Sequence, residues 1–272
     1  MLVYCNGEII EKETVAQILE PGYLFGWGVF ETLRAYQGNI PFFSLHLERL
    51  NRSLALLGME PLLLDGSRQI EELLSRNSLV DGYIRITAYK RRQGTGIIIY
   101  VAPFGYYPPE VYEKGFCAML TSSYFDTNSI SWQLKSLSYL EKRLAWFRAQ
   151  GAGKDEALVR NREGFIVGGA RSNLFLVKEE EVIIPHRECG TFAGITKEIV
   201  RKIILNLGIA VREEKISPEN LFSSREAFLT SALLEVMPLV ECEGRPIGKG
   251  LPGDLTCKIL SRYRELTHLA TV

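Results

Sequence analysis

Most strand-forming segments of this chain come in neighbouring pairs that a short polar turn separates. The first pair surrounds Asn6-Gly7, a dipeptide typical of the two-residue type I′ turn. The same pattern predicts further hairpins with the strand pairs 29–36 and 40–43, 83–89 and 97–101, 156–160 and 165–167, and 173–177 and 182–184. Because hairpins join antiparallel strands, this order argues against a regular alternation of parallel strands and helices and predicts an α+β fold.

Amphipathic segments, with apolar residues three or four positions apart, predict the helices. One is expected to begin with Ser44 as its cap and to end at Gly58, and its inner face carries Leu47, Leu50, Leu54 and Leu57. Other helices are expected over 67–77, 137–150 and 196–207. Further strands are predicted at 116–121, 227–230 and 236–241.

A segment rich in glycine and proline near residues 105–115 interrupts this pattern and reads as a linker. It divides the 272 residues into two expected α+β domains, 1–115 and 116–272. Small-molecule sites commonly form where domains meet, so the cleft between them is the expected site.

Basic and acidic side chains number 32 each, so no overall field favours nucleic acid or an anionic membrane as a partner. No apolar run is long enough to span a bilayer, and the first residues do not resemble a signal peptide. Five scattered cysteines without a Cys-x-x-Cys pair indicate reduced thiols in a cytoplasmic protein. Three separate histidines lack the spacing of a metal site, so no metal is expected.

Lys135 is the first candidate for chemistry, and it lies where a short strand is expected to run into a helix. A lysine forms a Schiff base with an aldehyde only when it is unprotonated, which requires burial or a nearby positive charge to lower its pKa. Taken alone, a lysine at a helix start is more often a surface residue.

Gly194-Ile195-Thr196 is the second candidate, because it opens the amphipathic helix over 196–207. The free backbone N–H groups and the dipole of a helix start favour a phosphate, and the Thr196 hydroxyl adds a donor. An ordinary helix start is the alternative. Together, a reactive lysine and a phosphate site suggest pyridoxal phosphate.

Several short motifs, in their order and spacing along nearly the whole chain, resemble those of the class IV aminotransferases, the fold-type IV pyridoxal phosphate enzymes. This family includes branched-chain and D-amino-acid aminotransferases and 4-amino-4-deoxychorismate lyase. The motifs are Phe25-Gly26-Trp27-Gly28-Val29-Phe30-Glu31, His46-Leu47-Glu48-Arg49, Tyr83-Ile84-Arg85, Lys135-Ser136-Leu137-Ser138-Tyr139, Ser172-Asn173-Leu174-Phe175, Gly194-Ile195-Thr196 and 229–238.

The resemblance implies a two-domain fold with pyridoxal 5′-phosphate in the interdomain cleft and Lys135 as its Schiff-base lysine. It makes Arg49 a phosphate partner, for which a planar guanidinium is suited, and gives Tyr139 a bond to the phenolic oxygen of the cofactor. The other residues that it implies for cofactor binding are Ser172, Asn173, Gly194, Ile195, Thr196, Ser231 and Ala232. Half-buried packing is the alternative for Tyr139, and His46 is expected to be a packed or capping residue.

On the substrate side, Tyr83 and Arg85 alternate along one strand and therefore point to one face. In this family the region helps to hold the substrate carboxylate, although a surface pair is an equal alternative. Phe25 and Phe30 are candidates for the pocket wall, and core packing is as good an explanation. The resemblance also implies a homodimer in which the partner completes each pocket.

One position departs from the family pattern. A glutamate normally precedes the Ser-Asn-Leu-Phe motif and pairs with the pyridine nitrogen, which strengthens the ring as an electron sink. Here Gly168 takes its place and Glu163 is out of register. We therefore expect a weaker sink and slow transamination, with water or a remote group at the nitrogen. Arg171 is one such group, although its register fits the phosphate side better.

Three functions remain open on the sequence. The first choice is 4-amino-4-deoxychorismate lyase, which makes 4-aminobenzoate and pyruvate, because the segment from Lys135 to Glu141 and Ser231-Ala232-Leu233 look similar to lyase sequences. An aminotransferase for branched-chain or D-amino acids is the alternative. A cofactor-binding protein with little catalysis, as Gly168 suggests, is the third.

Overall fold

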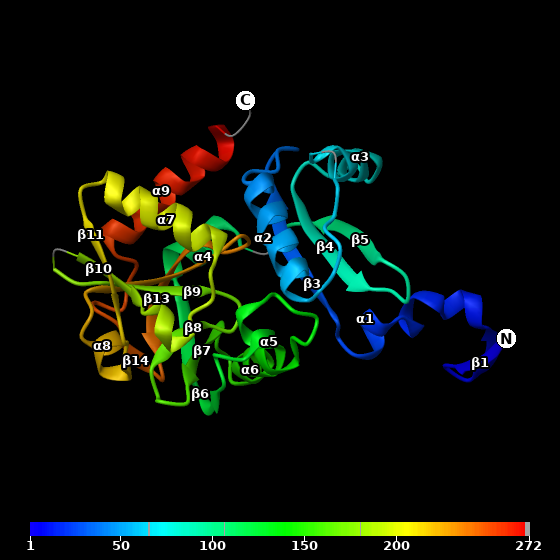
Figure 1. Ribbon diagram of the computed structural model, residues 1–272. Helices are drawn as coiled ribbons and strands as arrows, with labels where there is room; N and C mark the ends of the chain where they lie inside the picture. Colours follow the sequence, from blue (N-terminus) through cyan, green and yellow to red (C-terminus); the bar gives the residue numbers. More distant parts are fainter. Residues whose placement is uncertain (65, 106, 180, 270–272) are drawn as a thin grey trace.

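The computed structural model describes residues 1–64, 66–105, 107–179 and 181–269 (Figure 1). Within these ranges a three-stranded sheet and a nine-stranded sheet carry most of the chain, and a separate hairpin lies at the N-terminus. This mixture of antiparallel hairpins and helices confirms the predicted α+β class.

The N-terminal hairpin pairs β1 (Leu2–Cys5) with β2 (Glu8–Glu11). Asn6 and Gly7 have φ angles of 50° and 99°, the positive values that a type I′ turn requires, so the predicted turn is confirmed. A 3-10 helix, η1 (Lys12–Leu19), and a short helix, α1 (Pro21–Leu24), lead to the first sheet.

The small sheet is antiparallel and has the order β3 (Gly28–Ala35), β4 (Gly82–Lys90), β5 (Thr95–Pro103). Helices α2 (Phe43–Leu56) and α3 (Arg68–Arg76) share a buried apolar cluster with it. The inward leucines of the predicted helix contribute as expected, since Leu50 and Leu54 are buried and Leu47 and Leu57 pack against them.

Two local predictions in this region are wrong. Residues 40–43 form no strand, because only an isolated bridge joins Tyr36 to Asn39. Phe42 has a left-handed φ of 61° and precedes the first helical residue, Phe43, so Ser44 lies inside the helix and does not cap it.

The large sheet is mixed and runs β11-β10-β9-β12-β13-β6-β7-β8, with β14 paired to β13. Its antiparallel pairs include the predicted hairpins β7–β8 and β9–β10, and also β12–β13, whose strands were predicted without a pairing. The pairs β6–β13, β6–β7 and β10–β11 are parallel. The strands are β6 (Phe116–Phe125), β7 (Glu156–Asn161), β8 (Ile166–Gly169), β9 (Asn173–Val177), β10 (Glu181–Pro185), β11 (Ala210–Glu214), β12 (Glu226–Ser231), β13 (Glu235–Cys242) and β14 (Arg245–Pro246).

Helices cover this sheet. Helix α6 contacts β6 and β7 (Figure 1). Helices α7 and α9 contact each other and β12, and α9 also contacts β13. The helices of this part are α4 (Pro109–Lys114), α5 (Ile130–Gln133), α6 (Leu140–Gly151), η2 (Arg187–Cys189), α7 (Ile195–Asn206), α8 (Pro218–Phe222) and α9 (Asp254–Leu269). The expected linker thus contains α4, the expected strand before Lys135 is the helix α5, and α9 was not predicted.

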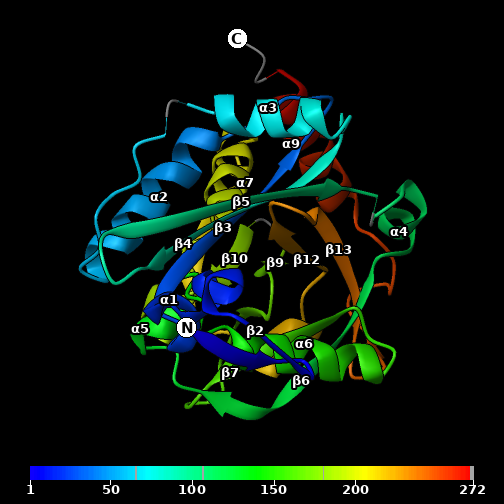
Figure 2. The same ribbon diagram turned by 90° about the vertical axis from the view of Figure 1, so that its right-hand side faces the viewer.

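Separate apolar clusters lie under the two sheets, and the larger one contains the stacked rings of Phe175 and Phe228, 4.8 Å apart. The small sheet passes in front of β12 and β13 when the molecule is seen from the side (Figure 2). The two-domain layout is therefore observed, while the exact boundary at residue 115 stays a prediction. No helix within the described residues combines the length and apolarity needed to cross a bilayer.

Candidate active site

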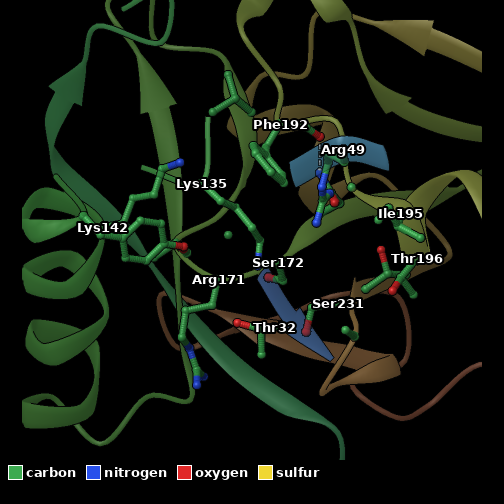
Figure 3. A pocket seen from close by; sticks show the side chains of 18 of the residues that line it. Thr32, Arg49, Lys135, Lys142, Arg171, Ser172, Phe192, Ile195, Thr196 and Ser231 are labelled. Atoms are coloured by element: carbon green, nitrogen blue, oxygen red, sulfur yellow. Dashed lines mark hydrogen bonds between the residues drawn. The ribbon is translucent and has the colours of Figure 1, made fainter. Parts of the chain in front are cut away.

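A pocket of about 660 Å³, partly open to solvent, lies between the two sheets (Figure 3). Thr32 of β3 lines one side, and the segments that end β8, begin β9 and begin α7 line the other. All residues predicted to hold the cofactor meet here: Arg49, Lys135, Tyr139, Ser172, Asn173, Gly194, Ile195, Thr196, Ser231 and Ala232. The structure brings them together, and their individual roles stay predictions.

Lys135 lies in the connection between α5 and α6, where backbone bonds fix it against β3. Its carbonyl accepts from the N–H of Phe30 at 2.8 Å, and the neighbouring Ser136 forms a bridge with Val29. Burial lowers the pKa of Lys135 to about 8, against the opposing effect of Glu31 and with a contribution from Arg49. An amine with this pKa is unprotonated often enough near neutral pH to attack an aldehyde.

Glu31 forms the centre of a buried charged cluster beside Lys135. Its carboxylate accepts from Arg49 Nε at 2.7 Å and from Arg49 Nη2 at 2.6 Å, and it lies 2.8 Å from His46 Nδ1. Burial alone would raise the pKa of Glu31, but Arg49 and His46 outweigh it and lower the pKa to about 2. His46 is buried, as predicted for a packed residue, and it also borders the pocket.

Arg49 connects this cluster to the larger sheet. Its Nη1 donates to the carbonyl of Ala193 at 2.8 Å, directly before the start of α7. A guanidinium has five N–H donors, and these bonds use three of them. The remaining donors suit an anion bound at the helix start.

The start of α7 has the form of a phosphate cradle. Among the described residues no side chain caps this helix at Gly194, so its first backbone N–H groups are available to a ligand. A Cβ at Gly194 would lie 2.0 Å from Asn173 Oδ1, which explains the glycine. Thr230 adds a buried hydroxyl with no bonding partner in the described part of the chain. These donors fit the phosphate of pyridoxal phosphate.

Tyr139 borders the pocket from the residue before α6. Its hydroxyl donates to the carbonyl of Ala170 at 3.1 Å, and its ring meets Phe30 edge-on at 5.2 Å. Burial raises the pKa of Tyr139 to about 12, so the hydroxyl keeps its proton. The helix expected over 137–150 begins later than predicted, because Tyr139 has φ −98° and ψ 10° and precedes its first residue, Leu140.

Gly168, expected at the position of the family's glutamate, has a backbone conformation that L side chains rarely adopt. It has φ +143°, and a Cβ there would lie 2.9 Å from the Ser172 carbonyl oxygen. The nearby buried acid, Glu156, accepts from Ser172 Oγ at 2.9 Å and from the N–H of Ala157 at 3.0 Å. It does not line the pocket, whose described lining contains no carboxylate.

Arg171 also lines this pocket, but no hydrogen bond or ion pair among the described residues connects it to the start of α7. Its Nη2 donates to the carbonyl of Asp155 at 3.2 Å, and its guanidinium lies 4.2 Å from the centre of the Trp146 ring. Its expected fit to the phosphate side is therefore not supported by these contacts.

A second cavity, of about 1120 Å³, adjoins the pocket and shares Thr32, Lys135 and Tyr139 with it. Phe30, Tyr83 and Arg85 line it, so the predicted pair on β4 does face a cavity. The guanidinium of Arg85 lies 3.7 Å from the centre of the Phe30 ring. Phe25 is 74% exposed and borders none of the described cavities, so its predicted place in the pocket wall is not observed in this chain.

Sequence reasoning missed several lining or supporting residues. Glu31 stood in a quoted motif, and a charged residue inside a buried strand was a usable signal. Lys142 looked like an ordinary helix-surface lysine, and nothing in the local pattern shows that it is buried. The other missed lining residues are Thr32, Trp132, Val167, Gly169, Ala170, Phe192 and Thr230.

Comparison with known proteins finds relatives that align over nearly the whole chain. Residues 28–242 match the family model of amino-transferase class IV. The chain is 31% identical to a putative branched-chain-amino-acid aminotransferase of Methanocaldococcus jannaschii, with 98% of this chain and 96% of that one covered. It is 28% identical to the D-alanine aminotransferase of Bacillus licheniformis, with 94% and 93% covered.

A solved structure has the same fold over almost the whole length. The branched-chain aminotransferase of Thermoproteus uzoniensis, with norvaline, superposes with a TM-score of 0.82 at 29% identity and covers 98% of this chain and 95% of that one. The family match extends from β3 to β13 and includes Lys135 and the start of α7. The chain belongs to the class IV aminotransferases, a family of enzymes that use pyridoxal phosphate.

Proposed function

We propose that this enzyme is an amino-acid aminotransferase for substrates with an apolar side chain. The observation that carries the proposal is the position of two cations about one aromatic ring. Lys135 Nζ lies 5.0 Å and Arg85 Cζ 3.7 Å from the centre of the Phe30 ring, and both line the same cavity. In an α-amino acid the carboxylate is attached to the carbon that bears the amine. Arg85 would therefore bind the carboxylate while Lys135 faces that carbon.

The residues of the chain divide the work between binding and proton transfer. Arg49, the backbone N–H groups at the start of α7 and Thr230 would hold the phosphate. Pyridoxal phosphate supplies an aldehyde and an electron-withdrawing ring. Lys135 Nζ would take the proton from the substrate Cα, as a general base with a lowered pKa. Arg85 would hold the carboxylate and so fix which bond faces Lys135.

Part of the remaining cavity wall suits an apolar side chain. Phe30, Tyr107, Leu233 and Leu234 supply that apolar part, while Arg143 and Arg171 also line the cavity. Burial of an apolar side chain against such a wall contributes about 25 cal/mol per Å². The names of the two curated relatives, one a putative branched-chain-amino-acid and one a D-alanine aminotransferase, support the same reaction class.

The lyase is the second candidate, and the sequence alone placed it first. Ser231, Ala232 and Leu233 form the segment that resembles the lyases, and all of them border the substrate cavity. Both reactions begin with the same lysine and the same proton. They differ in the outcome, because elimination returns the cofactor as an aldehyde whereas transamination leaves it as an amine.

This difference gives the test. The purified enzyme with pyridoxal phosphate is mixed with L-leucine, D-alanine or 4-amino-4-deoxychorismate, and the visible spectrum is followed with Lys135→Ala as the control. Conversion of the cofactor to its amine form by an amino acid supports the aminotransferase. Release of 4-aminobenzoate and pyruvate with the aldehyde spectrum retained would establish the lyase. A normal aldehyde spectrum without any turnover would leave the cofactor-binding protein as the remaining function.

We also propose that the enzyme is a cytoplasmic homodimer. Among the described residues all five cysteines are free, which agrees with a reducing compartment. The N-terminal segment exposes Leu2, Tyr4, Ile9 and Leu24, which a second copy would cover. Sedimentation equilibrium tests the dimer, since a monomer at micromolar concentration would contradict it.

A further inference from the structure

Lys142 is a second buried lysine in the same pocket as Lys135. It extends from α6 and lies on the side away from Ile195 and Thr196, with Lys135 between (Figure 3). Only 7% of its surface is exposed. Its Nζ donates to the carbonyl of Trp132 at 3.0 Å, which uses one of its hydrogen-bond positions.

Aromatic rings surround this amine. Its Nζ lies 4.1 Å from the centre of the Trp132 ring, 5.2 Å from that of Tyr139 and 5.3 Å from that of Phe192. Among the described residues no carboxylate forms an ion pair with it, although the charge of Glu141 acts on it. Burial, reinforced by the charge of Lys135, lowers the pKa of Lys142 to about 7. A buried lysine without an acid is costly to fold, so packing alone does not explain it.

The missing acid of the family belongs to the same pocket. Gly168 lies between Val167 and Gly169 on β8, and these two neighbours line the pocket together with Lys142. The only carboxylate close behind this wall, Glu156, is already bonded to Ser172 and Ala157 among the described residues. The side of the pocket away from the phosphate cradle therefore presents a hydrogen-bond donor and no carboxylate.

A donor and a carboxylate act in opposite ways on a ring nitrogen. A carboxylate stabilises the protonated nitrogen, whereas an N–H donor or a nearby positive charge favours the unprotonated nitrogen, which can accept a hydrogen bond. Pyridoxal phosphate carries its phosphate at one side of the ring, so its ring nitrogen must meet other walls of the pocket than the α7 start.

We propose that Lys142 donates a hydrogen bond to the ring nitrogen of bound pyridoxal phosphate and holds that nitrogen unprotonated. The proposal rests on pyridoxal phosphate as the cofactor of the family. It does not depend on whether the enzyme is an aminotransferase or a lyase. Its consequence is a ring that withdraws electrons less strongly, so the enzyme depends more on Lys135 and the held carboxylate for its rate.

The direct test uses nitrogen NMR of the enzyme loaded with pyridoxal phosphate labelled with ¹⁵N at the ring. The wild type is expected to show the resonance of an unprotonated nitrogen at pH 8. Lys142→Met keeps the length and removes the donor, so its ring resonance should shift. Lys258→Met removes an exposed lysine of α9 and should leave the resonance unchanged. A protonated nitrogen in the wild type, or an unchanged resonance in Lys142→Met, would overturn the proposal.

A second measurement covers the case in which Lys142→Met folds poorly. Affinity for pyridoxal phosphate is compared with affinity for its 1-deaza analogue, in which carbon replaces the ring nitrogen. The wild type should prefer the natural cofactor by about tenfold, the effect of one hydrogen bond. Lys142→Gln, which keeps a donor, should retain part of this preference. Equal affinities in the wild type would contradict the bond. Failure of pyridoxal phosphate to bind at all would count against the proposed function instead.

Discussion

The carboxylate of Glu31 and the guanidinium of Arg49 face each other in a two-pronged ion pair, with N–O distances of 2.7 and 2.6 Å. Glu31 belongs to β3 of the small sheet, and Arg49 also bonds the carbonyl of Ala193 before α7. The pair therefore fixes the guanidinium that borders the anion cradle and sets a negative charge beside Lys135. One ion pair thus influences both the surroundings of the α7 start and the amine of Lys135.

Replacement of Glu31 with glutamine should weaken cofactor binding and lower the pKa of Lys135. The variant leaves the Arg49 charge without its partner, and loss of one member of a buried pair destabilises a protein by about 3–5 kcal/mol. Lys135 loses the negative charge that raises its pKa, so its pKa should fall below about 8. Urea unfolding measures the loss of stability, equilibrium binding of pyridoxal phosphate measures the affinity, and the pH dependence of the covalent attachment rate measures the pKa of Lys135. Glu48→Gln, at the exposed pair with Arg52, is the matched control.

The same substitution should change the acid sensitivity of the protein. Because the folded state lowers the pKa of Glu31 from 4.5 to about 2, its stabilising contribution is complete above pH 4.5 and is lost as the pH falls through 2. The unfolding free energy of the wild type should therefore exceed that of Glu31→Gln above pH 4.5, and this difference should disappear as the pH falls toward 2. A difference in unfolding free energy that is constant from pH 7 to pH 2.5 would contradict this assignment.

The rate at which the enzyme captures the cofactor aldehyde should rise with pH and level off above about 8. Burial lowers the pKa of Lys135 to about 8, and only the unprotonated amine is nucleophilic. Stopped-flow absorbance between pH 6 and 10 measures the rate constant for covalent attachment, with Lys135→Ala as the control. A rate that still rises at pH 10 would indicate an ordinary exposed lysine.

Arg85→Ala should lower kcat/KM for an amino acid by roughly 10- to 100-fold, because a hydrogen bond to a charged group contributes about 1.5–3 kcal/mol. Arg85→Lys should lose less, since it keeps the charge but not the planar fork. The main effect is expected in KM, as the carboxylate is held before the reaction. Arg91→Ala, at an exposed residue after β4, should have normal kinetics. Equal losses of kcat/KM in Arg85→Ala and Arg91→Ala would point to a general charge effect.

The sequence predicted those parts of the fold that local rules determine. The Asn6-Gly7 turn needs two positive φ angles, and the apolar face of α7 repeats at the helical period, so both elements could be predicted from the sequence. The start of α2 could not be predicted, because Phe42 has a left-handed φ of 61° that its residue type does not suggest. That conformation depends on tertiary contacts, among them the Tyr263 ring, 6.2 Å away.

The candidate site shows the same division. Short motifs identified Lys135, Arg49 and the α7 start, because each has a sequence signature. Whether a charged side chain is buried depends on distant segments of the chain. The sequence therefore did not reveal Lys142, which extends from α6 and packs against Trp132 of α5 and against Phe192. The sequence did not reveal the constraint at Gly168 for the same reason. The constraint comes from the Ser172 carbonyl oxygen, which leaves no room for a side chain at position 168.

Any side chain at position 168 should destabilise the protein, so a single Gly168→Glu substitution will not restore the acid of the family cleanly. The φ of +143° is strained for an L-residue, and a Cβ lies 2.9 Å from a backbone oxygen that cannot rotate away. We expect Gly168→Ala to cost at least about 1–3 kcal/mol. Gly151→Ala is the control, because a Cβ at this end of α6 meets nothing within 4 Å and its φ is not positive.

Urea unfolding of both alanine variants makes the comparison direct, because Gly151→Ala should be neutral or stabilising by up to about 1 kcal/mol. Stability of Gly168→Ala equal to that of the wild type would show that β8 adapts easily. In that case the glutamate could return by one substitution, and its absence would not be imposed by the backbone. A large loss confined to position 168 means that the backbone of this strand does not accommodate the glutamate, so a group other than a side chain at 168 meets the ring nitrogen.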